Sequence, residues 1–177
     1  VLAARSDDYR YIPVLWAALG ALTVPSILLV TTLGAEVITA AQLAVFCVLA
    51  LVFRLPPVLI RLIPREVRHW RASNMARRQF LQQGLHQTRG QSGLLIFVSE
   101  AEHYVEIIAD RGINRRVPPE RWQEIVAAFT RELKAGRTLA GFESAISQCG
   151  EILRSQVPKT PDNHNELDDR LILIGYD

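Results

Sequence analysis

This sequence of 177 residues has little lysine, little cysteine and no recognisable catalytic motif. These features argue against nucleic-acid binding, a disulfide and several common enzyme classes in turn. Lysine occurs twice, and a formal net charge of +2 is too small to indicate nucleic-acid binding by itself. The two cysteines, Cys47 and Cys149, lie in such different contexts that we expect no disulfide, which fits a reducing compartment. Because no Walker loop, Gly-x-Ser-x-Gly or His-Glu-x-x-His motif is present, the common NTPase, hydrolase and zinc-protease signatures are excluded.

The residue types that most often carry catalysis are scattered along the chain. No two of the four histidines have metal-ligand spacing on one predicted element. Four residues separate Cys149 from Arg154, one fewer than a cysteine-phosphatase loop needs, and Cys149 falls on an apolar helix stripe, where core packing is the better interpretation. Asp110 beside Arg111 is interpreted as a turn-stabilising pair. The oxygen-rich segment 162–169 lacks the glycine and the closing glutamate of an EF-hand loop and is interpreted as solvated tail.

Charge is absent from two long stretches near the amino end. No charged residue occurs in 11–35 or in 37–53, and Glu36 alone separates them. Because about twenty helical residues span the hydrocarbon layer of a bilayer, we predict a transmembrane hairpin over 9–54, with helices at about 11–33 and 37–53. Pro25 should kink the first helix. The alternative is a helical hairpin buried in a soluble core, although core helices rarely run this long without a polar face.

Arginines crowd around the ends of this hairpin and are absent from the loop between its helices. The positive-inside rule therefore predicts that both ends of the chain lie in the cytoplasm. Residues 55–72 are predicted to form a basic juxtamembrane collar, for which a merely solvated linker is the alternative. The residues expected at the membrane surface are Arg54, Arg61, Arg65, Arg68, Trp70 and Arg71. No aromatic platform accompanies this charge, so no nucleic-acid partner is expected.

Residues 73–177 alternate between helical and strand patterns, which favours an α/β domain, or α+β sandwich. We predict a helix over 73–87, a strand over Leu94–Ser99 paired with a second over 103–110, a helix from Pro118 and Pro119 to Gly136, and a last helix capped by Thr138. The segment Leu94–Ser99 is apolar on both faces. It should therefore be central in the sheet and have a neighbour on each side.

The opening segment Val1–Ala4 is the candidate for the missing neighbour. We predict that residues 1–8 belong to the soluble domain and that Val1–Ala4 pairs in parallel with Leu94–Val98, which makes the apolar hairpin an insertion within a β-α-β crossover. Such an insertion costs little, because loop-closure entropy grows slowly with loop length. A disordered leader is the alternative. The start of this strand is expected to lie before Val1.

Three segments of the soluble part resemble the TPM domain, a family named for thylakoid lumen, photosystem repair and receptor-modulator proteins. They are "GLLIFVSEAEHYVEIIADRGI", "VPPERWQEIV" and "LAGFESAISQCGEIL", and the resemblance extends over about 93–169. It rests on fold-type motif residues, which are Gly112, Trp122, Asn165 and Glu166, while Asp168 stands where bacterial relatives have proline. From this resemblance, together with the apolar hairpin and the lack of a catalytic motif, we predict a bacterial inner-membrane protein whose TPM-like soluble domain faces the cytoplasm and acts as a binding or assembly module of unknown biochemical activity.

The same resemblance leaves two other functions open. Phosphatase activity and calcium binding within the family imply a metal-dependent phosphatase as one alternative, and a purely structural, oligomerising membrane protein is the other. Asp7 and Asp8 follow the first strand, and Ser99 and Glu100 follow the second, so parallel pairing should bring them to the edge of the sheet where ligands bind. A divalent cation such as calcium is the candidate ligand of Asp7 and Asp8, with loop solvation as the alternative. The expected partners are the lipid bilayer and another membrane protein or a second copy.

Overall fold

The computed structural model describes residues 1–6, 9, 11–28, 34–88, 90–157 and 170–176, and the chain divides into two compact units. The α/β unit consists of Val1–Ser6 and Arg68–Asp177, and the apolar unit consists of Asp7–Val67. In sequence, the apolar unit therefore interrupts the α/β unit after its first strand.

The α/β unit contains a sheet of four strands in the order β3-β2-β1-β4. The strands are β1 (Leu2–Ala3), β2 (Leu94–Ser99), β3 (Tyr104–Ala109) and β4 (Leu173–Ile174). In β1, Leu2 lies opposite Val98 on one side and Leu173 on the other, and both pairings are parallel. β2 and β3 form an antiparallel hairpin. The predicted parallel pairing of the opening segment and the central position of β2 are both confirmed.

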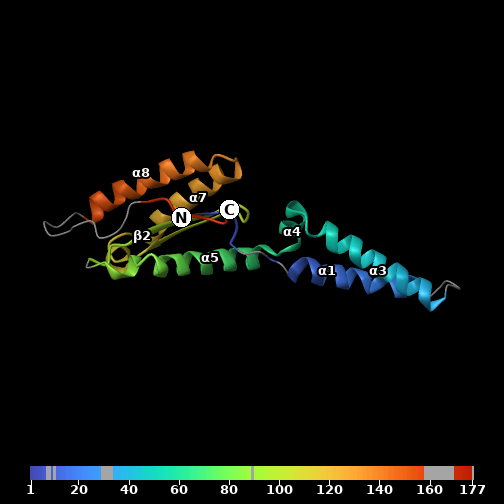
Figure 1. The fold of residues 1–177 in the computed structure, drawn as a ribbon. Helices are drawn as coiled ribbons and strands as arrows, with labels where there is room; N and C mark the ends of the chain where they lie inside the picture. Colours follow the sequence, from blue (N-terminus) through green and yellow to red (C-terminus); the bar gives the residue numbers. More distant parts are fainter. Residues whose placement is uncertain (7–8, 10, 29–33, 89, 158–169, 177) are drawn as a thin grey trace. The chain divides into compact units, whose positions relative to one another are not determined.

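Helices cover both faces of this sheet, with α5 (Arg65–Gln82) on one face and α7 (Pro119–Lys134) and α8 (Thr138–Gln156) on the other (Figure 1). Successive residues of a strand point to opposite faces. Accordingly, Phe97 packs in the cluster under α5, whereas Val98 packs in the cluster under α7 and α8. Both side chains are fully buried, which explains why β2 carries apolar residues without alternation.

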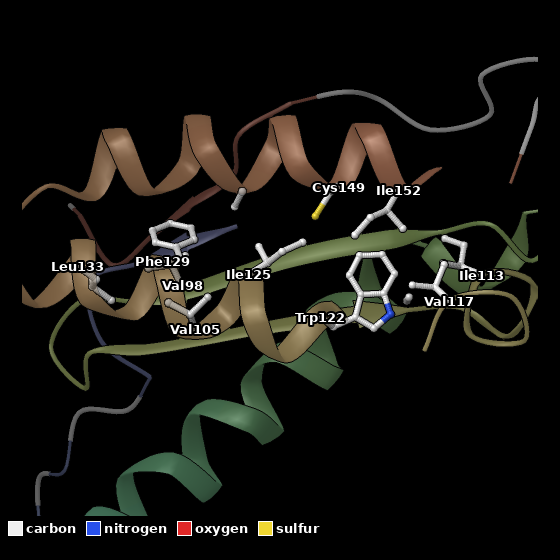
Figure 2. Packing of buried hydrophobic residues seen from close by; sticks show 12 residues of the cluster. Val98, Val105, Ile113, Val117, Trp122, Ile125, Phe129, Leu133, Cys149 and Ile152 are labelled. Atoms are coloured by element: carbon white, nitrogen blue, oxygen red, sulfur yellow. The ribbon is translucent and has the colours of Figure 1, made fainter. Parts of the chain in front are cut away.

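The larger core lies between the sheet and the two carboxyl-side helices (Figure 2). From α7, Trp122, Ile125 and Phe129 point into it at helical spacing, and Cys149 enters from α8. α8 can approach α7 because Gly141 has no side chain, since a Cβ at this position would lie 2.3 Å from the ring of Phe129. These contacts make Cys149 a core residue, as its position on the apolar stripe predicts.

Several elements differ from the sequence prediction. α5 begins at Arg65 instead of at residue 73, and it ends before Gly84, whose φ of 67° is left-handed and leads into the short 3₁₀ helix Leu85–Gln87. Thr138 does not cap α8 but is its first residue. The strand β4 and the four-residue helix α6 (Arg111–Asn114) are additional elements, and the latter begins where Asp110 accepts a hydrogen bond from the Arg111 N–H at 2.7 Å.

The apolar unit contains four helices, which are α1 (Tyr11–Ala21), α2 (Thr23–Leu28), α3 (Ala35–Val52) and α4 (Pro56–Leu62). Pro25 has no N–H to donate to the carbonyl of Ala21, and the helical segment divides between α1 and α2 at this point. α1 packs against α3 through small residues, because a Cβ at Gly20 would lie 2.7 Å from Leu49 Cδ1. By length and composition, Tyr11–Leu28 and Ala35–Val52 could each cross a membrane.

Candidate functional site

Several polar side chains meet at the carboxyl ends of the parallel strands. Ser6 follows β1, Ser99 ends β2, and the turn between β2 and β3 carries Glu100 and Glu102. The backbone ties these loops together, since the Glu100 N–H donates to the Ala3 carbonyl at 3.0 Å. Open α/β sheets bind ligands at this edge, which makes it the first place to look for a functional site.

Glu102 is the buried charge of this edge, with only 3% of its surface exposed. One carboxylate oxygen accepts hydrogen bonds from the Ser6 N–H at 3.1 Å and from Ser6 Oγ at 2.8 Å. The other oxygen accepts from the hydroxyl of Ser99, which is itself fully buried. Hydrogen bonds to an ionised acceptor are stronger than neutral ones, so Glu102 fixes the loop after β1 against the end of β2.

Glu100 ties the same edge to two more distant segments. Its Oε1 accepts a hydrogen bond from Thr138 Oγ1 at the start of α8 at 3.0 Å, and its Oε2 accepts one from the Tyr176 hydroxyl beyond β4 at 2.7 Å. Loss of hydration and the bond to Glu100 raise the pKa of Tyr176 well above its usual range. Tyr176 therefore remains a protonated donor at physiological pH.

The described side chains of this edge hold the loops after β1 and β2 together, and we call Ser6, Ser99, Glu100 and Glu102 the carboxyl-edge clasp. Ser99 is fully buried, so its hydroxyl cannot reach a substrate, although it donates to a carboxylate as a serine nucleophile donates to its base. The oxygens of Glu100 and Glu102 already accept bonds from protein donors. Within the described part of the chain, no group of three or more histidine, cysteine, aspartate or glutamate residues could hold a metal ion.

A second polar cluster attaches α5 to β3 on the face of the sheet that α5 covers. Glu106 on β3 accepts hydrogen bonds from the Tyr104 hydroxyl at 3.0 Å and from Ser73 Oγ on α5 at 3.3 Å. The ring of His69 lies against that of Tyr104, with centroids 5.2 Å apart. Burial raises the pKa of Tyr104 to about 12, so this hydroxyl also stays a donor.

The predicted site residues fall into two groups. Ser99 and Glu100 meet the segment after β1 at one edge, as parallel pairing predicts. Asp7 and Asp8, the predicted cation ligands, lie outside the described residues, as do Asn165 and Glu166. Sequence reasoning missed Glu102, whose only signal was an acidic residue three positions after a strand-ending serine in a short turn.

The other predicted residues have packing roles. The Gly112 N–H donates to the Gln91 carbonyl at 2.9 Å, and a Cβ at Gly112 would lie 2.3 Å from the Gly90 carbonyl oxygen, so this turn has no room for a side chain. Trp122 belongs to the larger core. Burial raises the pKa of the Cys149 thiol to about 11, which keeps it protonated and unreactive.

Comparisons with known proteins agree with this architecture. Residues 60–152 match the model of the TPM domain, which begins earlier than the predicted resemblance and includes α5. The NMR structure of BA42 from the psychrophilic bacterium Bizionia argentinensis is similar, with a TM-score of 0.52 and 25% sequence identity over 58% of this chain and 70% of BA42. Comparison with functionally curated proteins gives no match. The TPM model spans more than half of the chain and covers the α5, hairpin, α7 and α8 arrangement described above, so this chain belongs to the TPM domain family.

Proposed function

We propose that this protein is a membrane-anchored TPM domain protein whose α/β unit is a binding or assembly module. One observation carries the membrane part of the proposal: α3 has eighteen residues, and none of them is buried. All but Glu36 of these residues are uncharged, and large side chains such as Leu43, Val48 and Leu51 are more than half exposed. In water, an apolar surface of this length would promote aggregation, whereas in a bilayer the lipid chains surround it without such a cost.

The packing within the apolar unit supports the same environment. The buried residues of α1 are Pro13, Ala17 and Ala21, four positions apart on one face, and the large side chains point away from it. Helix pairs in lipid associate through small residues in this manner, because lipid provides no hydrophobic force to drive large ones together. A hairpin buried in a soluble core would instead bury its large residues, which is the opposite distribution.

The orientation proposed for the hairpin can be tested by labelling. In a variant with Cys47 and Cys149 replaced by alanine, Ala35→Cys introduces an exposed thiol at the first residue of α3, next to the loop that contains no arginine. Leu139→Cys introduces one on the exposed side of α8. In intact cells, an impermeant maleimide should modify the first variant and leave the second unmodified until the cells are lysed. Labelling of Leu139→Cys alone in intact cells would show the reverse orientation, and extraction of the unmodified chain by alkaline carbonate would contradict the anchor.

The arginine-rich residues around the anchor are proposed to contact anionic headgroups. Arg54, Arg61 and Arg65 are exposed, and Trp70 on α5 has 67% of its surface exposed. An indole with an apolar body and a polar N–H suits the headgroup layer, where each nearby arginine contributes about 1 kcal/mol of attraction. Arg68 and Arg71 are half-buried on α5 and complete the membrane-surface set.

The proposed role as a binding or assembly module rests on the hydrogen-bonded polar residues at the carboxyl edge of the sheet. Among the residues that the structure describes there, the carboxylates of Glu100 and Glu102 accept bonds from protein donors, and the buried Ser99 is closed to substrates. Binding through surfaces is therefore better supported than turnover. The partner class is a membrane protein, either a different one or a second copy. We expect the full chain, purified in mild detergent after cross-linking in cells, to carry a defined protein partner and to hydrolyse a generic aryl phosphate no faster than a detergent blank. A monomer without cross-links, or metal-dependent hydrolysis, would contradict the proposal.

A further inference from the structure

The side of α5 that points away from the sheet carries large apolar side chains. Ala72, Ala76 and Phe80 bury the opposite side of the helix against the sheet. Trp70 and Leu81, by contrast, have 67% and 58% of their surfaces exposed. They are eleven residues apart, which is about three helical turns, so they lie in line on one stripe at a separation of about 16 Å. We call this exposed side of α5, from Trp70 to Leu81, the outward stripe.

The charge of α5 has a single sign over most of its length. After Glu66 in the first turn, the helix contains no acidic residue. Arg78 is exposed and forms no ion pair with any residue that the structure describes. Arginines beside exposed apolar residues are typical of helices that lie in the interface of an anionic bilayer. The arginines that follow Glu66 in α5 are Arg68, Arg71, Arg77 and Arg78.

The place of α5 in the chain favours lipid over a protein as the occupant of the outward stripe. Residues 65–67 belong to the apolar unit, and the same helix continues to residue 82 in the α/β unit. In the proposed anchor, α5 therefore starts at the bilayer surface. A helix directed straight away from that surface would carry Leu81 about 24 Å into water, whereas a helix along the surface keeps Trp70 and Leu81 at one depth.

We propose that the outward stripe lies along the bilayer surface, with Trp70 and Leu81 among the headgroups and the arginines of α5 at the phosphates of anionic lipids. This inference rests on the membrane anchor proposed above, and it extends the membrane-surface residues from the collar ending at residue 72 to the end of α5. Because α7 and α8 cover the other face of the sheet (Figure 1), the same arrangement turns their exposed sides toward cytoplasmic partners.

The test measures contact with lipid by tryptophan fluorescence in the full chain, reconstituted in vesicles. Lipids brominated near the headgroup quench a tryptophan at the surface, and lipids brominated deep in the acyl chain quench one within the bilayer. Buried Trp122 is kept in every variant, and its own signal is subtracted. With Trp16 and Trp70 changed to phenylalanine, Leu81→Trp reports on the outward stripe. Leu139→Trp, at a position 72% exposed on α8, is the matched control.

In vesicles with about 30% phosphatidylglycerol, shallow bromines should quench Leu81→Trp about threefold more than Leu139→Trp. Replacement of Arg77 and Arg78 by glutamine should reduce this difference by about half, as should vesicles without anionic lipid. Equal quenching of Leu81→Trp and Leu139→Trp would overturn the inference. So would a Leu81→Trp that is shielded both from the bromines and from aqueous acrylamide, because a protein would then cover the stripe.

A variant that retains Trp16 separates failure of this inference from failure of the anchor. Trp16 lies on α1, so deep bromines should quench it if the apolar unit spans the bilayer. Quenched Trp16 together with equal quenching of Leu81→Trp and Leu139→Trp would leave the anchor standing and overturn only the placement of α5. Trp16 that no brominated lipid quenches would overturn both.

Discussion

Replacement of Glu102 by alanine should lower the free energy of unfolding of the α/β unit by about 3 kcal/mol, because it removes the acceptor of the buried Ser99 hydroxyl and of the partly buried donors of Ser6. The Ser6 N–H and the hydroxyls of Ser6 and Ser99 all donate to this carboxylate. Ser99 is fully buried, so water cannot replace the lost acceptor without opening the end of β2. The measurement is urea unfolding in micelles, followed by the fluorescence of Trp122 after Trp16 and Trp70 are changed to phenylalanine.

A matched control separates this effect from the loss of a negative charge. Glu124 pairs with Arg121 at 3.0 Å on the exposed side of α7, and Glu124→Ala should change stability by less than about 0.5 kcal/mol. Glu102→Gln keeps one acceptor oxygen but places an amide NH2 group next to the donors. Its loss of stability should therefore lie between those of Glu102→Ala and Glu124→Ala. If Glu102→Ala behaved like Glu124→Ala, the clasp at the carboxyl edge would have no energetic role.

A strand of the sheet could be predicted where burial on both faces requires apolar residues at successive positions. β2 is apolar at successive positions because Phe97 and Val98 are buried on opposite faces, and this pattern requires a neighbour on both sides. That requirement identified Val1–Ala4 as a strand. β4 has no such pattern, because it is two residues long, lies at the edge of the sheet, and has Leu173 more than half exposed.

The boundaries of α4 and α5 were missed for a different reason. The sequence predicts only a basic collar over 55–72, whereas Pro56 is the first residue of α4 and Pro64 stands directly before α5. Proline lacks the N–H that a first helical turn leaves unused, so the same residue that interrupts a helix also begins one. The clasp was missed because it depends on the turn that folds Glu102 back toward Ser6, a contact across ninety-six positions.

Leu2→Asp should destabilise the α/β unit by about 3 kcal/mol or more, which corresponds to roughly 10 °C in Tm. The backbone of Leu2 pairs with both β2 and β4, and its side chain packs against the core beneath α7 and α8. A carboxylate there loses its hydration and faces apolar atoms. The backbone hydrogen bonds of β1 cannot offset this, because they are unchanged by the substitution.

The control for Leu2→Asp is Leu139→Asp on α8, which places the same new charge on a side chain with 72% of its surface exposed and should leave Tm within about 2 °C. Thermal unfolding followed by Trp122 fluorescence reports on the α/β unit in both variants. The comparison tests whether a strand separated from its neighbour β2 by the whole apolar unit is part of the cooperative core. Equal Tm values for the two variants would mean that β1 detaches without cost, and the apolar helices would then precede the folded domain instead of interrupting it.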